Sequence, residues 1–215
     1  MASTQAYEAK SAARRPVADK PGRVCGLLGS RSVVLIGLMG AGKTTVGRRL
    51  AAAMGLDFFD ADQEIEKAAG MSVAEIFDNH GEEYFRDGER RVLARLLEPK
   101  PRIVSTGGGA FMHADTRDLV RQRSVSVWLR GELPLLLERV MRRNNRPLLK
   151  KNPEAVLKKL IAERHPVYQL ADITVDSRAV AHEVIVDDII SALDVFLTQT
   201  HANPDQDPSG QAADE

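Results

Sequence analysis

The 215-residue sequence has little cysteine, no excess of charge of either sign and no long hydrophobic run. Its single cysteine, Cys25, cannot form a disulfide within the chain, which favours a reducing, cytoplasmic location. Lysine and arginine number 30, as do aspartate and glutamate, so net charge gives no case for nucleic-acid or membrane binding. No stretch is apolar for long enough to span a membrane, and the first residues lack the hydrophobic segment of a secretory signal. These absences predict a cytoplasmic protein and give no reason to expect a nucleic-acid or membrane partner.

Both ends of the sequence have the composition of tails. Residues 1–30 mix small, proline, glycine and basic residues without sustained periodicity, and residues 201–215 are acidic and contain proline and glycine. We therefore expect a disordered extension over 1–30, one domain over 31–200 and a disordered tail over 201–215. An organellar transit peptide is the alternative for the basic N-terminal segment. If the extension is disordered, deleting it leaves turnover and stability nearly unchanged.

Strand and helix patterns alternate between the two ends. Five short apolar or β-branched runs are typical of buried strands. They lie at 32–38, at about 57–60, from Arg102 to the glycines at 107–109, at 124–129 and at 172–177. The helix pattern before the last strand is expected to end at Pro166. Strands with intervening helices predict an α/β fold, a parallel sheet covered on both faces, with ligands at the carboxyl ends of the strands.

A glycine-rich segment, GLMGAGKTT, follows the first predicted strand. Four residues separate Gly37 from the pair Gly42-Lys43, which is the spacing of a phosphate-binding loop (P-loop). Glycines let the backbone N–H groups approach phosphate oxygens closely. Lys43 is expected to reach the β- and γ-phosphates of a nucleotide, and the Thr44 hydroxyl to bind Mg²⁺. The helix pattern that follows puts the phosphates at a helix N-terminus, where unpaired N–H groups favour anions.

Other interpretations of this segment compete with a nucleotide-binding loop. An ordinary glycine-containing turn is one, and a dinucleotide-binding loop is disfavoured because it needs glycine where Thr45 stands. A GTPase-like switch is another. The pattern D-x-x-G occurs at 78–81, but it follows a helix pattern rather than a strand, and the sequence contains no N-K-x-D.

Acidic residues and glycines follow the second and third predicted strands. Asp60 and Asp62 lie two residues apart on a segment taken as extended, so both carboxylates are expected to face the phosphate site. One would serve Mg²⁺ and the other an acceptor hydroxyl, although Asp62 as the N-cap of the next helix is the alternative. The glycines at 107–109 expose backbone N–H groups, which suit a small anionic or hydroxylated ligand, unless they form only a flexible turn.

Six motifs, in their order and spacing, resemble those of the shikimate kinase family. They are GLMGAGKTTVGRRLA, FFDADQEIE, IFDNHGEEYFRDGE, STGGGA, RPLL and ERHPVY, and the resemblance covers about residues 33–197. It implies a three-layer P-loop kinase fold, like that of nucleoside monophosphate kinases, with a five-stranded parallel sheet and a mobile lid at about 143–154. The implied reaction transfers the γ-phosphate of ATP, with Mg²⁺, to the 3-hydroxyl of shikimate in chorismate and aromatic amino-acid biosynthesis. A monomer is expected.

The resemblance also assigns residues to the acceptor. Asp62 is expected to bind the ring hydroxyls of shikimate near the attacking oxygen, either as general base or as an orienting group. Arg86 and Arg164 are expected to hold its carboxylate, a task suited to the guanidinium fork. Residues 107–109 are expected to contact shikimate through their backbone.

On the nucleotide side, the resemblance places Arg139 against adenine and Asp60 with Thr44 at the metal. Arg146 is expected to move in with the lid onto the transferring phosphoryl group, completing a catalytic set with Lys43 and Asp62. The loop residues expected to hold ATP are Gly40, Ala41, Gly42, Lys43, Thr44 and Thr45. A gluconate or nucleoside monophosphate kinase shares the loop and the lid, so a panel of acceptors is needed to separate these activities.

Overall fold

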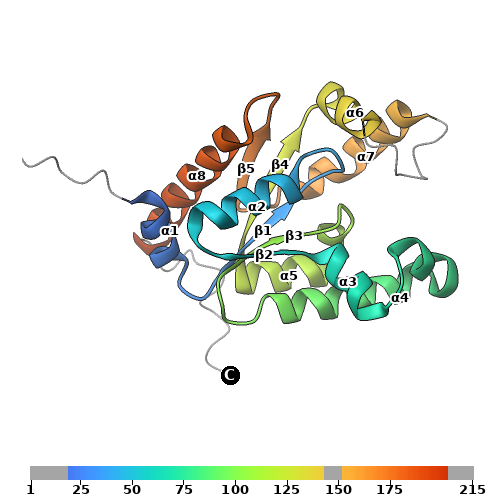
Figure 1. Ribbon diagram of the computed structural model, residues 1–215, viewed down its shortest axis with the longest axis horizontal. Helices are drawn as coiled ribbons and strands as arrows, with labels where there is room; N and C mark the ends of the chain where they lie inside the picture. Colours follow the sequence, from blue (N-terminus) through green and yellow to red (C-terminus); the bar gives the residue numbers. More distant parts are fainter. Residues whose placement is uncertain (1–18, 143–151, 203–215) are drawn as a thin grey trace, which may run out of the picture.

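Five parallel strands form the central sheet of the computed structural model, which describes residues 19–142 and 152–202. The strands are β1 (Ser32–Ile36), β2 (Asp57–Asp60), β3 (Arg102–Ser105), β4 (Ser124–Gly131) and β5 (Ile173–Ser177). Their order across the sheet is β2-β3-β1-β4-β5, and each pair of neighbours is parallel (Figure 1). The predicted five-stranded parallel sheet is confirmed.

Helices cover both faces of this sheet and complete three layers. In the described part of the chain they are α1 (Lys20–Leu28), α2 (Lys43–Met54), α3 (Ala61–Ala69), α4 (Val73–Leu96), α5 (Ala114–Arg123), α6 (Leu133–Met141), α7 (Pro153–Tyr168), α8 (His182–Ala202) and the 3₁₀ turn η1 (Ala110–Met112). Helices α2 and α8 pack side by side with α1 next to them, while α5 and α7 lie on the opposite side, next to η1 (Figure 1). Sequence reasoning did not anticipate α5 or η1. None of the described helices is long and apolar enough to cross a membrane.

Strand β1 lies at the centre of the sheet and is buried along its whole length. Val33, Val34 and Leu35 are each 0% exposed, because helices shield both faces of a parallel sheet. Because β1 and β3 are parallel neighbours, the loops that follow them leave the sheet side by side. Strand order alone thus brings the P-loop next to the three glycines, as the rule for parallel sheets predicts.

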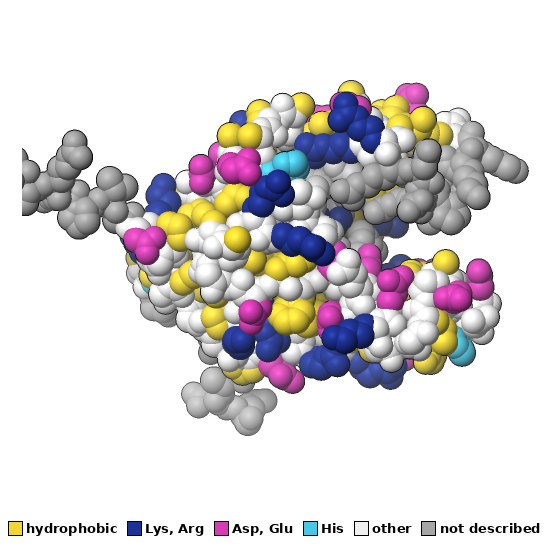
Figure 2. Space-filling model, in the orientation of Figure 1, with side chains coloured by type: hydrophobic (Ala, Val, Ile, Leu, Met, Phe, Trp, Pro, Cys, Tyr) yellow, Lys and Arg dark blue, Asp and Glu magenta, His cyan; other side chains and the backbone are white. Residues whose placement is uncertain are grey.

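Helices α3 and α4 form a separate lobe beyond the edge strand β2 (Figure 1). Helix α4 starts with a capping box in which Ser72 and Glu75 satisfy each other's backbone N–H groups. Its course breaks at Gly81, whose φ of 82° lies outside the helical region. A hollow lies above this lobe on the right-hand side of the molecule (Figure 2).

Residues 20–28, inside the extension expected to be disordered, instead form helix α1, so that prediction is wrong for this part of the chain. Asp19 caps the helix by accepting a hydrogen bond from the N–H of Gly22 at 3.2 Å. Val24 and Leu28, one turn apart, are 0% and 2% exposed and belong to the core. Two apolar residues are too few to show periodicity, and contact with α8 rather than propensity stabilises so short a helix.

Truncation of this segment is therefore expected to destabilise the protein. Leu28→Ala should lower the free energy of unfolding by about 2–5 kcal/mol, because it opens a cavity between α1 and the core. Gly26→Ala is a matched control, since Gly26 is an exposed helical residue whose added Cβ would meet no atom within 4 Å. That substitution should raise stability by roughly 0.5–1 kcal/mol. Urea denaturation measures both, and unchanged midpoints for the two variants would mean that α1 does not form.

Two further boundaries differ from the prediction. Helix α7 continues past Pro166 to Tyr168, and after the proline the N–H of Gln169 still donates to the carbonyl oxygens of His165 and Val167. The helix also begins at Pro153, capped by Asn152, so the last residues of the expected lid are helical. Helix α8 reaches Ala202, two residues into the expected acidic tail.

Candidate active site

The P-loop joins β1 to α2 and turns at three glycines with positive φ. Gly37 approaches β4 so closely that an added Cβ would stand 2.6 Å from the carbonyl oxygen of Leu129. Gly42, with φ of 94°, is the N-cap residue of α2, so the first N–H groups of this helix face outward as an anion site. A cavity of about 290 Å³ opens over this helix start. It is lined by Met39, Gly40, Gly42, Lys43, Thr44, Thr45, Arg139, Val140, Arg142 and His182.

The first two residues of α2 carry the polar groups of this cavity. Lys43 donates hydrogen bonds to the carbonyl oxygens of Gly37 and Leu38 at 2.8 and 3.2 Å. The hydroxyl of Thr44 donates to Oδ2 of Asp60 at 2.8 Å. A cation, a hydroxyl and a carboxylate therefore meet at the N-terminus of α2, as the sequence predicts.

This oxygen pair fits Mg²⁺ held by few protein groups. The described residues contain no cluster of three or more histidine, cysteine, aspartate or glutamate side chains that could hold a metal by themselves. Mg²⁺ in phosphoryl-transfer sites takes one or two protein oxygens and completes its octahedron with phosphates and water. Thr44 and Asp60 supply that number of protein oxygens beside the cavity.

Arg139 connects the P-loop to the end of β5. Its guanidinium donates to the carbonyl oxygen of Gly40 at 3.2 Å, to the Ser177 hydroxyl at 2.8 Å and to the Arg178 carbonyl at 2.9 Å. The Ser177 hydroxyl in turn donates to the carbonyl oxygen of Ala41 at 2.9 Å. Burial lowers the pKa of Arg139 from its usual value, but these acceptors keep it hydrogen-bonded. Sequence reasoning missed Ser177, whose contacts bridge segments far apart in the chain.

The three glycines that follow β3 (residues 107–109, hereafter the glycine loop) each lie against a charged side chain. A Cβ added to the first would stand 2.6 Å from Oδ1 of Asp62. A Cβ on the second would stand 3.0 Å from Nη1 of Arg164, and one on the third 2.7 Å from Nη2 of Arg86. None of the three has positive φ, so the effect of a side chain here would be to displace the charged group that faces it. The structure thus brings together three charged residues that the sequence places in three separate motifs.

The glycine loop also offers hydrogen-bond donors. Among the described residues, the backbone N–H groups of 107–109 have no acceptor, whereas the N–H of the next residue, Ala110, donates to the carbonyl of Gly107 at 3.2 Å. Free donors on a partly exposed loop between charged side chains suit a small ligand that carries hydroxyls and a negative charge.

Asp62 reaches this loop by a different route from the one expected. Helix α3 begins at Ala61, so Asp60 and Asp62 do not share an extended segment, and their carboxylates lie at different groups, Thr44 and Gly107. The alternative of Asp62 as N-cap is also wrong, because Asp60 is the N-cap residue and its side chain makes no capping bond. The one-residue shift between strand end and helix start places one carboxylate at the P-loop and the other at the glycine loop.

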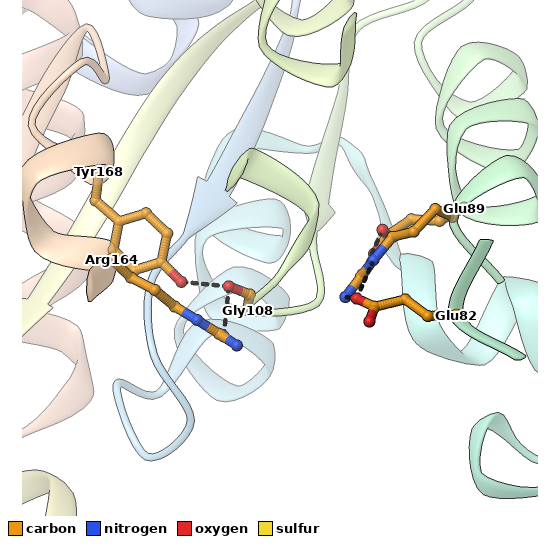
Figure 3. A network of polar contacts seen from close by, with 6 residues as sticks. Glu82, Glu89, Gly108, Arg164 and Tyr168 are labelled. Atoms are coloured by element: carbon orange, nitrogen blue, oxygen red, sulfur yellow. Dashed lines mark hydrogen bonds and ion pairs between the residues drawn. The ribbon is translucent and has the colours of Figure 1, made fainter. Parts of the chain in front are cut away.

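Arg86 is held from two sides by carboxylates of its own helix, α4. It bonds to Glu89 at 2.8 Å and to Glu82 at 3.0 Å (Figure 3). Burial lowers the Arg86 pKa, but the two carboxylates outweigh it and raise the pKa above its usual value. Burial raises the pKa of Glu89, against the opposing effect of Arg86. The buried Oε1 of Glu89 has no hydrogen-bond partner among the described residues, and it faces the first glycine of the glycine loop.

Arg164 and Tyr168 approach the glycine loop from α7. Both donate hydrogen bonds to the carbonyl oxygen of Gly108, Arg164 at 2.7 Å (Figure 3). Burial raises the pKa of Tyr168, and the neighbouring Arg164 opposes this shift. Sequence reasoning selected Arg164 and missed Tyr168 and Glu89. The signals were their positions, four residues after Arg164 and three after Arg86, which put each on the same helix face as its arginine.

Arg146 and most of the expected lid lie outside the described residues. Helices α6 and α7 flank the segment 143–151, as expected of a connection between two helices.

Comparison with known proteins identifies relatives over most of the chain. The sequence profile of the shikimate kinase family matches residues 39–194. A shikimate kinase from Rhodopseudomonas palustris is 54% identical over 178 residues, which are 82% of this chain and 88% of the relative.

Solved structures give the same result. The shikimate kinase from Acinetobacter baumannii, in complex with shikimate, superposes with a TM-score of 0.73 at 38% identity, covering 82% of this chain and 98% of the other. A gluconokinase from Sinorhizobium meliloti superposes with a TM-score of 0.57 at 20% identity, covering 81% and 97%. At that identity the gluconokinase shows a shared fold alone.

Proposed function

The chain belongs to the shikimate kinase family, and on that premise we propose that this site transfers the γ-phosphate of ATP to the 3-hydroxyl of shikimate. The products are shikimate 3-phosphate and ADP. The observation that supports this assignment is the convergence of Asp62, Arg86 and Arg164 on the glycine loop, one charged side chain at each glycine. Shikimate carries ring hydroxyls for a carboxylate and a carboxylate for two guanidinium groups.

The two substrates then meet at neighbouring strand ends. A Cβ on Gly108 would stand only 3.5 Å from the carbonyl oxygen of Gly37, so the glycine loop touches the P-loop. Phosphoryl transfer has a loose transition state that demands in-line positioning and neutralisation of charge more than covalent chemistry. The fold supplies the positioning, since β1 and β3 are adjacent.

Positive groups gather where the phosphates of ATP would lie. Lys43 and the N–H groups at the start of α2 bind the phosphate oxygens, and Thr44 and Asp60 hold Mg²⁺, which when bound neutralises charge on the β- and γ-phosphates. Arg139 is assigned to adenine, in keeping with its place between the P-loop and the end of β5. The family resemblance adds Arg146 as the group that meets the transferring phosphoryl.

Residues around the glycine loop hold the acceptor. Asp62 binds the ring hydroxyls and orients the attacking oxygen or accepts its proton. Arg86 and Arg164 bind the carboxylate, and the ion pair with buried Glu89 fixes the guanidinium plane of Arg86 before substrate arrives. The proposed site needs no residue from a second copy of the chain, and we propose that the enzyme acts as a monomer.

A panel of acceptors tests the proposed function. With Mg²⁺ and ATP, we expect ADP release with shikimate and none above background with gluconate or nucleoside monophosphates, measured in a coupled assay. Shikimate methyl ester is the informative control, since it keeps the reacting hydroxyl and removes the charge that Arg86 and Arg164 recognise. Turnover of gluconate or a nucleotide without turnover of shikimate would refute the assignment.

A further inference from the structure

The hydroxyl of Tyr168 is buried and makes one specific contact. Tyr168 is 0% exposed, and its ring packs against Trp128 of β4 with 5.9 Å between ring centroids. A buried hydroxyl needs a hydrogen-bond partner, and among the described residues the acceptor it bonds is the carbonyl oxygen of Gly108. Continuation of α7 beyond Pro166 puts Tyr168 one turn after Arg164, so both side chains reach the same oxygen.

Anchoring this carbonyl also fixes a donor on the other side of the backbone. In a trans peptide the C=O of one residue and the N–H of the next point in opposite directions, and the described chain contains no cis peptide. The Gly108 carbonyl points to α7, so the N–H of Gly109 points away from α7. Arg86 lies against Gly109, with Nη2 2.7 Å from the position of an added Cβ. Figure 3 shows two pairs of polar side chains on opposite sides of the loop. Tyr168 and Arg164 lie on one side, and Glu82 and Glu89 lie on the other.

We propose that Tyr168 is a positioning residue for the acceptor's carboxylate: by holding the Gly108 carbonyl, it directs the Gly109 N–H to the carboxylate that Arg86 binds. This inference rests on the proposed function. The Gly109 N–H has no acceptor among the described residues, so it is available to a ligand. Glycines leave a peptide free to rotate, and a fixed plane is what a directional donor needs.

The Gly108 carbonyl oxygen accepts hydrogen bonds from both Arg164 and Tyr168, and the two donors have different roles. The Arg164 guanidinium has five N–H donors and is itself assigned to the substrate carboxylate, so its bond to Gly108 shifts whenever it adjusts to substrate. The Tyr168 hydroxyl is carried by a ring that packs on Trp128, so it stays in place when the Arg164 side chain moves. The tyrosine therefore keeps the peptide plane constant while the arginine engages the ligand.

Tyr168→Phe tests the proposal, because it removes only the hydroxyl and keeps the packed ring. We expect the KM for shikimate to rise about tenfold, while kcat and the KM for ATP stay within about twofold. The loss should depend on the carboxylate. With shikimate methyl ester, which cannot accept a charge-assisted bond from the Gly109 N–H, the variant and the wild type should differ by less than about twofold.

Two comparisons separate positioning from general support. Tyr84→Phe is the matched control, since Tyr84 is an exposed tyrosine of α4. It should change the KM neither for shikimate nor for its methyl ester. An equal loss on shikimate and its ester would show that Tyr168 only stabilises the loop, and an unchanged KM for shikimate would show no role; either result overturns the proposal. The assays are run below the thermal midpoint of the variant. The ratio of the KM values for shikimate and for its methyl ester does not depend on how much of the protein is folded, so partial unfolding cannot imitate the expected result. Wild-type enzyme inactive on shikimate would instead refute the proposed function.

Discussion

Asp62→Asn is expected to lower kcat for shikimate by about 10²–10⁴-fold while leaving the affinity for ATP unchanged. The side chain lies against Gly107 on the acceptor side, and the neighbouring Asp60 contacts Thr44 on the nucleotide side. The amide keeps one acceptor oxygen but cannot take a proton. Stopped or coupled assays give kcat, and titration with ATP gives the dissociation constant.

The size of this loss distinguishes two roles for Asp62. A reduction near 10⁴-fold indicates that the carboxylate accepts the hydroxyl proton, whereas a reduction near 10²-fold indicates orientation alone. Asp60→Asn is the contrasting variant and should raise the Mg²⁺ concentration needed for half-maximal activity. Nucleotide affinity that falls in Asp62→Asn as much as turnover does would contradict the separation of the two carboxylates.

Lys43→Ala should lower kcat/KM for ATP by about 10²–10³-fold with any acceptor that the enzyme uses. The substitution removes a positively charged hydrogen-bond donor that stabilises the negative charge developing on the phosphates. In the structure Lys43 is bonded to the carbonyl oxygens of Gly37 and Leu38, within the loop that would enclose the phosphates. Measuring kcat/KM for ATP with shikimate and with its methyl ester tests whether the loss is independent of the acceptor.

The control for this variant is Lys67→Ala, on the outer surface of α3, where the side chain is 80% exposed. It should behave as wild type, since a solvated surface charge contributes little. A defect in Lys43→Ala confined to one acceptor would mean that the lysine does not act on the phosphates.

Local patterns were sufficient for the frame of the site. The apolar run of β1, the spacing of Gly37 and Gly42 and the helix pattern after Lys43 are all contained in about twenty residues, so strand, loop and helix could be predicted from the sequence. The parallel sheet followed from alternation of strands and helices, and its connection rules placed the ligands at the strand ends. The position of α1 could not be predicted in the same way. Its apolar pair has meaning only against α8, which begins more than 150 residues later in the chain.

The same limit applies inside the site. Arg86 and Arg164 were selected by resemblance, but the groups that hold them were not, because Glu89 and Tyr168 gain their roles only from burial and from contact with the glycine loop. The directions of Asp60 and Asp62 were misjudged because one residue decides whether a carboxylate follows a strand or starts a helix. Spacing within a helix was a signal that the sequence did contain, since Arg86 and Glu89, like Arg164 and Tyr168, lie one turn apart.

The glycine loop has a consequence for resistance to inhibitors. A compound that imitates shikimate would contact the backbone of this loop, so a substitution within the loop could exclude it only by adding a side chain. At residues 107–109 any added Cβ stands 2.6 to 3.0 Å from Asp62, Arg164 or Arg86, so the change that excludes the inhibitor also displaces a group that the substrate needs. Escape mutations against compounds that bind chiefly this loop should therefore be confined to residues around it, and those that do arise within it should carry a large cost in growth.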